Sequence, residues 1–467
     1  MDRKSRRGFL KTVGAGALAA VSGCSVDSNR KGSGVKEAAS RIQTKARDVW
    51  QTDVLVVGGG MAGMGAALAA SRAGAKTILI EDNGFMGGVA SYALGMPINQ
   101  MRPDSKPRGD IHELIIAKIK SYGDIAYREG QHQYWCNVDY LKVALINALE
   151  ETGCKYFVHV NAVDTIVKGN RVEGVLAGTK SGPVEIRAKC VIDCTGDADV
   201  SYFSGAETLK EAGQLSPLTL LLKVTNVDME EAKRVNIGEL AKKAREKYPL
   251  VPKDWRLTDN DPSSNSFYIN HSCLRDLGQF DGSDPESLTK AEVTARRQAI
   301  QMVGAMREFG GDALSKMELI GTSPRIAVRE SRRVKGVYVL TEEDAVEGHK
   351  FDDVIAWRSG FLDIGFVRLR EMKIHDVPYR SILPEKVDGL LTAGRCISAT
   401  HAAASAGKSM GNCVATGHAA GLAAAMAVKG RIVPRELKIS KLQDALRADN
   451  VDLTKGGSIQ ENVTLLG

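Results

Sequence analysis

Three glycines and one acid have the spacing that a dinucleotide site needs. Gly58, Gly60 and Gly63 follow the pattern G-x-G-x-x-G, with Gly59 between the first two, and Glu81 comes 18 residues after Gly63. In this pattern the first glycine makes a tight turn, the second lets the backbone approach a pyrophosphate, and the third lets a helix and a strand pack closely. The acid accepts hydrogen bonds from a ribose. These residues predict a dinucleotide-binding site.

The segments around these residues are the elements that would position them. An unbroken apolar run, residues 54–57, predicts a parallel strand that is buried on both faces. Residues 66–70 are strong helix formers, and residues 76–80 predict a second strand that ends at Glu81. The N-terminus of the helix would offer free N–H groups to the phosphates. The alternative, a glycine-rich turn, leaves the flanking strands and helix unexplained.

Two later segments extend the same site. Gly87 and Gly88 follow the ribose acid closely and predict a second approach of backbone to the dinucleotide, the alternative being a plain loop. Further along, residues 190–194 predict another buried strand, which runs directly into Thr195 and the residues after it.

Together these segments resemble a known family. The chain is similar to FAD-dependent oxidoreductases of the glutathione-reductase-like superfamily, and more narrowly to a bacterial family compared with the flavin core of heterodisulfide reductase. The resemblance covers roughly residues 53–452. It implies FAD as the cofactor. A strand ending in D-x-T-G-D closes the first half of the FAD domain in that family, which assigns Thr195, Gly196 and Asp197 to the cofactor.

The resemblance also covers the second half of the predicted FAD domain. Residues 390–398 match the final FAD signature, a short strand and turn beside the ribityl chain, and add Gly394 to the site. Related flavoproteins commonly have Asp after this glycine. Here Arg395 stands there, as is usual in the narrower family, so the resemblance implies no carboxylate contact with the ribityl chain.

A helix rich in Ala and Gly is predicted to follow, and it begins near Ser409, Met410 and Gly411. Its free N–H groups could face the pyrimidine edge of the flavin, where the reduced form carries negative charge. Many relatives have Arg where Lys408 stands, so the resemblance does not extend to a phosphate contact there.

Four residues are candidates for catalysis. On a strand predicted over residues 325–334, alternation would place Arg325, Arg329 and Arg333 on one face, where they could hold an anionic group over the flavin. The alternative is that these arginines pair with acids such as Glu342 and Asp344. His401 precedes the Ala-rich helix and is placed to exchange a substrate proton near neutral pH.

We expect an α/β fold: a Rossmann-like, glutathione-reductase-like FAD-binding domain with an inserted α+β substrate or cap domain. The predicted boundaries are 1–24 for a twin-arginine signal peptide with a lipobox, 25–50 for a flexible tether, 51–200 for the first part of the FAD-binding domain, 201–376 for the cap domain, and 377–467 for the second part with a C-terminal helix. Within the cap, residues 218–224 predict a strand, 229–247 and 290–309 predict helices, and 254–286 predict a long surface loop.

The N-terminus resembles an export signal. Residues 5–11 match the twin-arginine pattern S-R-R-x-F-L-K at every position, and residues 21–24 resemble a bacterial lipobox with Cys24 as the lipidated residue. The expected partners are therefore the twin-arginine export machinery and, through the lipid, a membrane, with the protein in the periplasm or cell envelope. The alternative is ordinary cleavage near Cys24.

Charge and cysteine spacing exclude other classes. The formal net charge is +7, of which the first 24 residues supply +4 from five basic residues and one acid, so about +3 remains, too little to indicate nucleic acid. The eight cysteines include no C-x-x-C, which gives no iron–sulfur pattern, and a disulfide cannot be assigned. We expect mostly small buried cysteines. No histidine spacing predicts a metal site.

Three functions are consistent with this sequence. The leading one is an exported enzyme that transfers a hydride between flavin N5 and a small substrate, an anionic one if the arginines bind it, with an electron donor or acceptor still to be assigned. The second is an electron-transfer module that passes electrons from its flavin to a redox partner protein, as in heterodisulfide reductase. The third, a lipid-anchored binding protein with a vestigial fold, conflicts with the intact glycine set.

Overall fold

The computed structural model describes residues 48–454, apart from residues 95, 131–132, 212, 214, 254, 259–265, 271–273 and 361–371. The predicted export signal, the lipobox cysteine Cys24 and most of the predicted tether lie outside this part of the chain. The tether was expected to reach residue 50, but the first strand already begins at Asp48.

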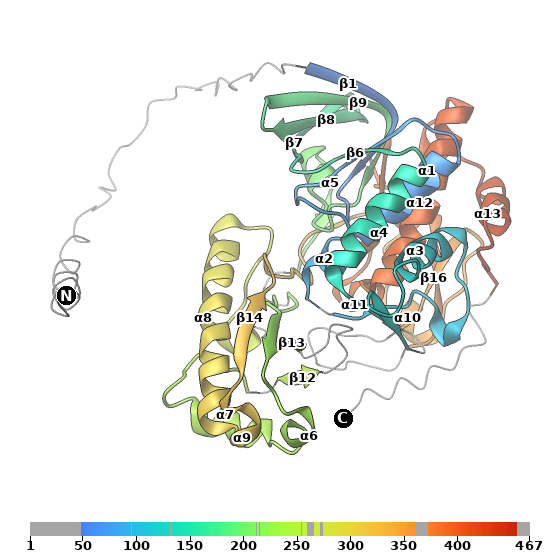
Figure 1. Ribbon diagram of the computed structural model, residues 1–467. Helices are drawn as coiled ribbons and strands as arrows, with labels where there is room; N and C mark the ends of the chain where they lie inside the picture. Colours follow the sequence, from blue (N-terminus) through green and yellow to red (C-terminus); the bar gives the residue numbers. More distant parts are fainter. Residues whose placement is uncertain are drawn as a thin grey trace, which may run out of the picture. The chain divides into compact units, whose positions relative to one another are not determined.

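A seven-stranded sheet forms the centre of the described chain (Figure 1). Its strands are β1 (Asp48–Val57), β2 (Thr77–Ile80), β6 (Lys155–Phe157), β7 (Asn161–Lys168), β8 (Arg171–Thr179), β9 (Gly182–Asp193) and β18 (Leu390–Thr392). The order is β6-β2-β1-β9-β8-β7, and β18 pairs with the end of β9. Strands β6, β2, β1, β9 and β18 are parallel, and β7, β8 and β9 form an antiparallel meander. This confirms the predicted Rossmann-like α/β fold. The strand predicted over residues 190–194 is the end of a longer strand, β9, which begins at Gly182.

Strand β1 is buried on both faces, as its apolar run predicts. Val54 and Val56 pack into a core shared with the helices, whereas Leu55 and Val57 pack into a second core with residues of the meander. Successive side chains of a strand point to opposite faces, so a run without polar residues fills both cores at once.

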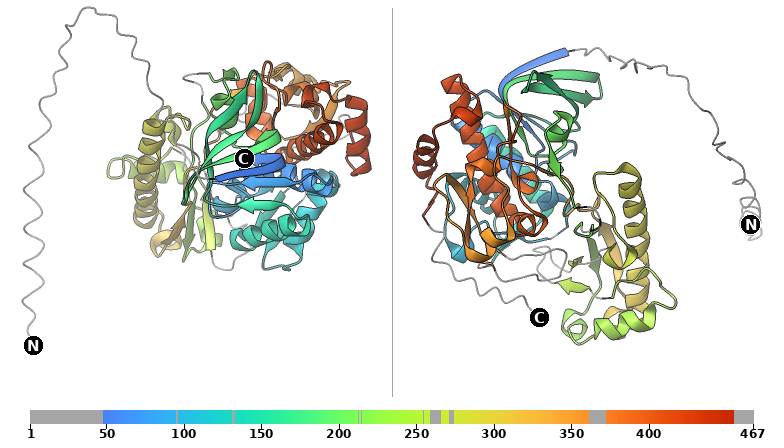
Figure 2. Two further views of the ribbon diagram at one scale, coloured as in Figure 1. Left: turned by 90° about the horizontal axis from the view of Figure 1, so that it is seen from above. Right: turned by 180° about the vertical axis from the view of Figure 1, so that it is seen from behind.

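The first core holds the longest helices of the FAD-binding part. These are α1 (Met61–Arg72), α3 (Asp110–Lys120), α4 (Val138–Glu151), α12 (Met410–Gly430) and α13 (Ile439–Ala448). Helices α1 and α12 lie side by side (Figures 1 and 2). A Cβ at Gly417 would overlap with the Ala62 carbonyl, and one at Gly421 would overlap with the Ala66 carbonyl. Four residues separate Gly417 from Gly421 in α12, and four residues separate their partners Ala62 and Ala66 in the same order in α1. The two helices therefore run in the same direction.

The cap has a hydrophobic core of its own, formed by buried residues from the sequence range Leu218 to Ile326. Its antiparallel sheet has the order β12-β13-β11-β14, and helix α8 packs on β14 (Figure 1). The elements are β11 (Leu222–Thr225), α6 (Met229–Ala232), α7 (Ile237–Ala244), β12 (Arg256–Thr258), β13 (Ser266–Asn270), α8 (Pro285–Phe309), α9 (Asp312–Ser315) and β14 (Glu318–Thr322).

Two expectations for the cap were wrong. The predicted surface loop, residues 254–286, contributes strands β12 and β13. Although the sequence of this segment is largely polar, β13 pairs with β11 and β12 pairs with β13. The helix predicted over residues 229–247 is two helices, α6 and α7, since Asn236 caps the second one through its side chain. The helix at 290–309 is confirmed and begins earlier, at Pro285.

The strand predicted over residues 325–334 was also wrong. Its last two residues are paired, as β15 (Arg333–Val334) against β10 (Thr208–Leu209), and Ala327 forms an isolated bridge with Thr219, but no continuous strand joins them. Within the predicted cap, Leu340 and residues 354–356 pack into the first core.

The remaining elements are short. They are α2 (Val89–Tyr92), β3 (Ile98–Asn99), β4 (Tyr127–Glu129), β5 (Gln133–Cys136), α5 (Asp199–Phe203), α10 (Glu342–Glu347), β16 (Val354–Arg358), β17 (His375–Pro378) and α11 (His401–Gly407). Strands β3, β5 and β4 form one small sheet, and β16 pairs with β17 in another.

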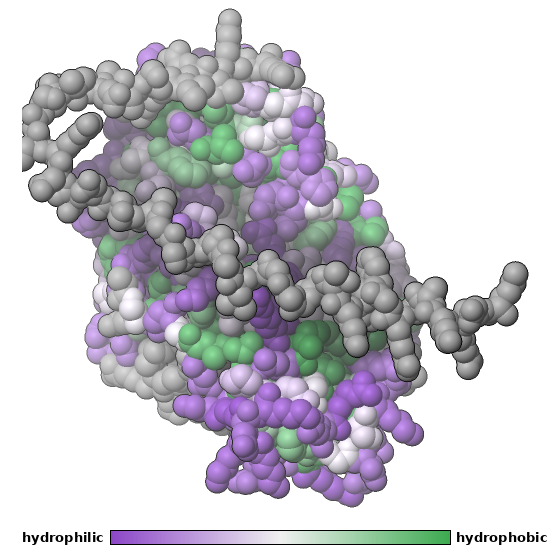
Figure 3. All heavy atoms as spheres, turned by 90° about the vertical axis from the view of Figure 1, so that its left-hand side faces the viewer, coloured by the Kyte–Doolittle hydropathy of each residue, from purple (hydrophilic) through white to green (hydrophobic). Residues whose placement is uncertain are grey.

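The surface is mixed in character. On the face shown in Figure 3, hydrophilic residues surround scattered groups of hydrophobic ones. Among the described helices, none is both long enough and apolar enough to span a membrane. Six described cysteines are buried and unpaired, which confirms the expectation for Cys136, Cys154, Cys190, Cys194, Cys396 and Cys413.

Candidate functional site

A cavity of about 270 Å³ lies where strands β1, β2 and β9 end. The glycine turn after β1 forms one wall, since Val57, the last residue of the strand, and Gly58, the next residue, both line the cavity. Ligands of open parallel sheets bind at this carboxyl edge. The predicted cofactor residues that line it are Gly58, Gly60, Glu81, Gly87, Gly88, Thr195, Gly196, Asp197, Arg395 and Met410.

The three motif glycines have different surroundings. A Cβ at Gly63 would overlap with the Gly58 carbonyl, so this position serves the packing of α1 on β1. A Cβ at Gly60 would meet no atom of the described residues within 4 Å, and Gly60 has an ordinary φ of −64° as the N-cap of α1. The space beside Gly60 is therefore open on the cavity side, which fits the close approach of a pyrophosphate.

Two helices begin at this cavity. Gly60 and Met61 start α1, and Met410 starts α12. Neither N-cap residue, Gly60 or Ser409, caps its helix with a side-chain hydrogen bond. The N–H groups of each first turn and the positive ends of both helix dipoles are thus directed toward an anionic ligand.

Glu81 is placed at the end of β2, as predicted, and is 4% exposed. Its carboxylate accepts hydrogen bonds from the backbone N–H of Gly59 at 2.5 Å and from that of Asn83 at 2.8 Å. Burial, with the neighbouring Asp82 adding to it, raises the pKa of Glu81 to about 7. The carboxyl group therefore changes its charge near neutral pH, next to the position expected for a ribose.

The segment after β9 is held by acids and arginines. Asp193 accepts hydrogen bonds from the backbone and hydroxyl of Thr195, at 3.1 and 2.7 Å, which fixes the turn. Arg395 donates to Asp197 at 2.9 Å, so this arginine reaches back to the first half of the site. Burial, with Asp197 nearby, raises the pKa of Asp199 to about 7.

Five predicted cofactor residues lie behind the lining. Gly59 donates to Glu81, and Gly63 packs on Gly58. The N–H of Gly394 donates to the Thr416 hydroxyl at 3.0 Å, while Gly411 packs against the Gln100 carbonyl and Ser409 directly precedes the first residue of α12. These five residues position the cavity wall.

The three arginines of the predicted anion clamp do not share one face, because the strand that was to align them is not formed. Arg325 lines the cavity and pairs with Asp82 at 2.8 Å. Arg333 is 1% exposed and pairs with both Glu330 and Glu211. Neither Arg329 nor Arg333 belongs to the lining formed by the described residues. The expected partners, Glu342 and Asp344, instead begin helix α10.

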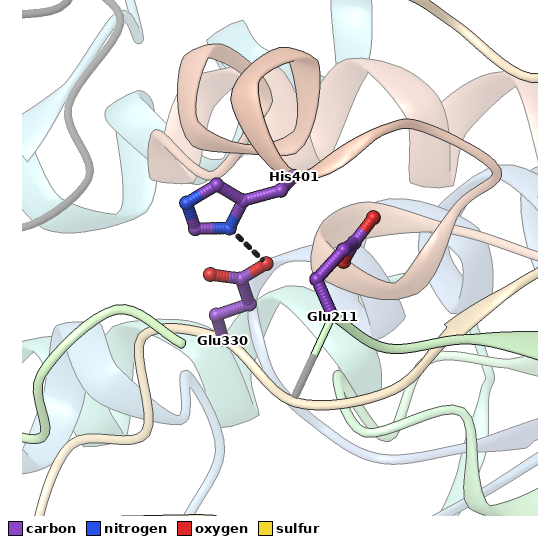
Figure 4. Close-up of side chains that lie close together, drawn as sticks. All are labelled: Glu211, Glu330 and His401. Atoms are coloured by element: carbon purple, nitrogen blue, oxygen red, sulfur yellow. Dashed lines mark hydrogen bonds and ion pairs between the residues drawn. The ribbon is translucent and has the colours of Figure 1, made fainter. Parts of the chain in front are cut away.

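His401 belongs to a cluster that sequence reasoning did not find (Figure 4). Its Nδ1 lies 2.7 Å from a carboxylate oxygen of Glu330, and Glu330 also accepts hydrogen bonds from the backbone and hydroxyl of Ser216, both at 3.1 Å. Burial opposes the charge on Glu330, yet the contacts with His401 and Arg333 hold its pKa below the ordinary value. An ionised carboxylate only accepts hydrogen bonds, so Nδ1 of His401 carries the proton and Nε2 is left to exchange one.

The same cluster has the residue types of a metal site. Glu211, Glu330 and His401 offer ligand atoms within 4.8 Å of one another. Arg333, however, pairs with both glutamates, so its guanidinium supplies the positive charge that a metal ion would bring. This favours a structural ion-pair network over metal binding.

The cavity includes residues that the sequence motifs missed. Asn83, Asn161, Asp199, Lys408 and Cys413 all line it. Asn83 and Asp199 follow strand ends, the signal that marks the carboxyl edge of a parallel sheet, so position alone could have suggested them.

The fold and the cavity define a dinucleotide-binding flavoprotein of Rossmann type. The chain belongs to the FAD dependent oxidoreductase family, whose sequence pattern matches residues 53–446. It is therefore an FAD-dependent enzyme, as the sequence resemblance predicted.

Individual relatives match less of the chain. The thiamine thiazole synthase of Pyrococcus horikoshii is 30% identical over 164 residues, which is 33% of this chain and 61% of that protein. The thiamine thiazole synthase of Aeropyrum pernix is 28% identical over 180 residues, 36% of this chain and 63% of that protein. The chain thus spans about three fifths of these relatives.

Solved structures are similar over more of the chain. A geranylgeranyl bacteriochlorophyll reductase-like protein from Thermoplasma acidophilum has a TM-score of 0.45 and 15% identity, covering 86% of this chain and 84% of that one. The anhydrotetracycline hydroxylase OxyS from Streptomyces rimosus has a TM-score of 0.46 and 11% identity, covering 85% and 65%.

The open space beside Gly60 leads to the first prediction. We expect Gly60→Val to weaken FAD binding at least about tenfold, because its side chain would fill the pyrophosphate approach. The stability of the apoprotein should change little, by about 0.5 kcal/mol, since the added Cβ has no protein atom within 4 Å. Titration of apoprotein with FAD and denaturant unfolding measure the two effects.

The matched control is Gly63→Ala. Its methyl group would overlap with the Gly58 carbonyl, so it should cost about 1–3 kcal/mol of folding stability. FAD binding by Gly60→Val at the strength of the natural protein would contradict the assignment of this space to the cofactor.

Glu81 leads to a pH prediction. An ionised carboxylate accepts more hydrogen bonds from ribose hydroxyls than a protonated one, and the pKa of Glu81 is about 7. FAD binding should therefore release a proton below pH 7, and affinity should rise with pH by up to about tenfold per unit until it levels off above that pKa. Fluorescence titrations from pH 5.5 to 8.5 measure this rise. Glu81→Gln should flatten it, and an equal slope in that variant would show that another group titrates.

Proposed function

We propose that this protein is an exported oxidoreductase that transfers a hydride between a small substrate and the N5 atom of FAD. The observation that carries the cofactor part is the cavity, with its open space at Gly60 and two uncapped helix N-termini. When bound there, FAD would supply the hydride chemistry. The residues assigned to it remain those that line or position the cavity wall.

His401 is the residue we propose for the proton that accompanies the hydride. It begins α11, in a short segment whose two flanks, Arg395 and Lys408, both line the cavity. Glu330 accepts a hydrogen bond from Nδ1, which leaves Nε2 to exchange a proton with the substrate. Ser216 donates a hydrogen bond to Glu330, and Arg333 forms an ion pair with it. A histidine fixed in one tautomer by a buried carboxylate is suited to general acid–base work near neutral pH.

The test begins with anaerobic screening of a metabolite panel for a compound that bleaches the flavin. With that compound, His401→Ala should keep FAD bound but slow bleaching by about a hundredfold or more, because the proton acceptor is lost. Stopped-flow absorbance measures the rate, and acid release of FAD measures the bound cofactor.

His349→Ala is the control variant, since this histidine is half-exposed and stacks on Phe351 at a ring distance of 4.5 Å. It should bleach at the rate of the natural protein. Unchanged bleaching in His401→Ala would remove His401 from the reaction.

The export part rests on the twin-arginine match of residues 5–11 and on Cys24. Changing Arg6 and Arg7 to Lys together should trap the precursor in the cytoplasm, whereas Arg3→Lys, outside the pair, should not. Cell fractionation measures both. Mass spectrometry should find the exported chain beginning at a lipid-modified Cys24, and an unmodified chain that begins earlier would refute the lipid anchor.

A further inference from the structure

Arg358 is a buried cation to which the described residues offer no hydrogen bond at two of its three side-chain nitrogens. It ends strand β16, is 2% exposed, and its Nε and Nη1 atoms make no hydrogen bond to any described residue. Burial lowers its pKa to about 10, so the guanidinium still carries its charge at neutral pH. An uncompensated buried charge is strongly unfavourable and persists in proteins where it serves a ligand or a partner group.

A second buried arginine shows the contrast. Arg108 is 4% exposed and donates to the Gln100 carbonyl at 2.9 Å, to Asn412 Oδ1 at 2.8 Å and to the Trp357 carbonyl at 2.6 Å. The two arginines lie close together in the fold, since Trp357 directly precedes Arg358. The fold therefore satisfies one guanidinium with its own atoms and leaves the other without hydrogen bonds at the two nitrogens.

The position of the Arg358 guanidinium is well defined. It lies against Gly407, the last residue of α11, where a Cβ would overlap with the guanidinium carbon. Gly407 stands two residues before Ser409, the N-cap of α12. Ser359, the residue after Arg358, also contacts the first turn of α12: its carbonyl oxygen accepts a hydrogen bond from the side chain of Asn412 at 2.9 Å.

This position adjoins the cofactor cavity. Lys408, which directly follows Gly407, lines that cavity together with Met410 and Cys413. Burial raises the pKa of the Cys413 thiol to about 11, while the charges of Arg358 and Arg395 both act in the opposite direction. Cys413 is thus within electrostatic reach of a guanidinium on the cavity wall and of the unpartnered one.

We propose that Arg358 binds a carboxylate group of the substrate at the junction of α11 and α12. One planar guanidinium matches the two oxygens and the single charge of a carboxylate, whereas a phosphate dianion would call for further cations. The positive end of the α12 dipole would add to the attraction. This subsite rests on the proposed hydride-transfer function, and it takes the place of the clamp expected from Arg325, Arg329 and Arg333.

The first experiment compares stability. In the FAD-loaded protein, Arg358→Met should leave the melting temperature unchanged or raise it, because it removes an uncompensated buried charge. Arg108→Met should lower it by several degrees, because it leaves three acceptors without their donor. If Arg358→Met lowers the melting temperature as much as Arg108→Met does, Arg358 is a structural cation and the proposal is overturned.

The second experiment measures anion binding to the oxidised, FAD-loaded protein. At equal ionic strength, the melting temperature of the natural protein should be higher in sodium acetate than in sodium chloride. The acetate affinity should fall at least about tenfold in Arg358→Met, the loss of a charged hydrogen-bonded pair. Gly407→Ala, which keeps the charge but displaces the guanidinium, should weaken acetate similarly and covers the case in which Arg358→Met does not fold.

The remaining outcomes separate the alternatives. Equal responses of the natural protein and Arg358→Met to acetate would overturn the subsite, and stabilisation by phosphate but not acetate would overturn the carboxylate assignment. A lowered flavin reduction potential in Arg358→Met with unchanged acetate binding would make the arginine a flavin contact. No turnover is involved, so these results stand apart from the bleaching test: intact bleaching without acetate binding overturns the subsite alone.

Discussion

The close packing of α1 against α12 is the constraint on which the site depends. Gly417 and Gly421 lie where any side chain would overlap with the carbonyls of Ala62 and Ala66, so the two backbones approach more closely than larger residues would allow. Because the helices are parallel, both N-termini open at one edge of the sheet. The start of α1 and the start of α12 thereby form one wall that attracts anions, although some 350 residues separate them in the sequence. That separation is about the length of a large domain.

Paired charge is the second organising feature. Three arginines near the cavity are matched by acids: Arg325 by Asp82, Arg332 by Asp199, and Arg395 by Asp197. The first two pairs join the segment after β14 to residues that line the cavity, and the third joins the turn after β18 to the turn after β9. Removing one partner of such a pair leaves a charge uncompensated, so each pair fixes its two segments relative to one another. Among the described residues, Arg358 departs from this pattern, and this difference is the basis of the proposed carboxylate subsite.

The histidine cluster shows how a site can be built from distant and unremarkable residues. Glu330 lies in an irregular segment, Ser216 comes from the start of the cap, and His401 opens a short helix. No local motif joins them. Their common feature is a single buried carboxylate that holds a ring nitrogen, which selects one tautomer and presents the other nitrogen.

The sequence by itself determined the β1-α1-β2 unit, the glycine spacing, Glu81 and the long helices α8 and α12, because each follows from local periodicity and local turn chemistry. It did not determine strands β12 and β13 or the irregular course of residues 325–332, because strand pairing depends on partners elsewhere in the chain. The pairing of charges was decided the same way: Arg325 and Asp82 lie 243 residues apart, and only the tertiary structure brings them together, while no described residue forms a hydrogen bond with Nε or Nη1 of Arg358.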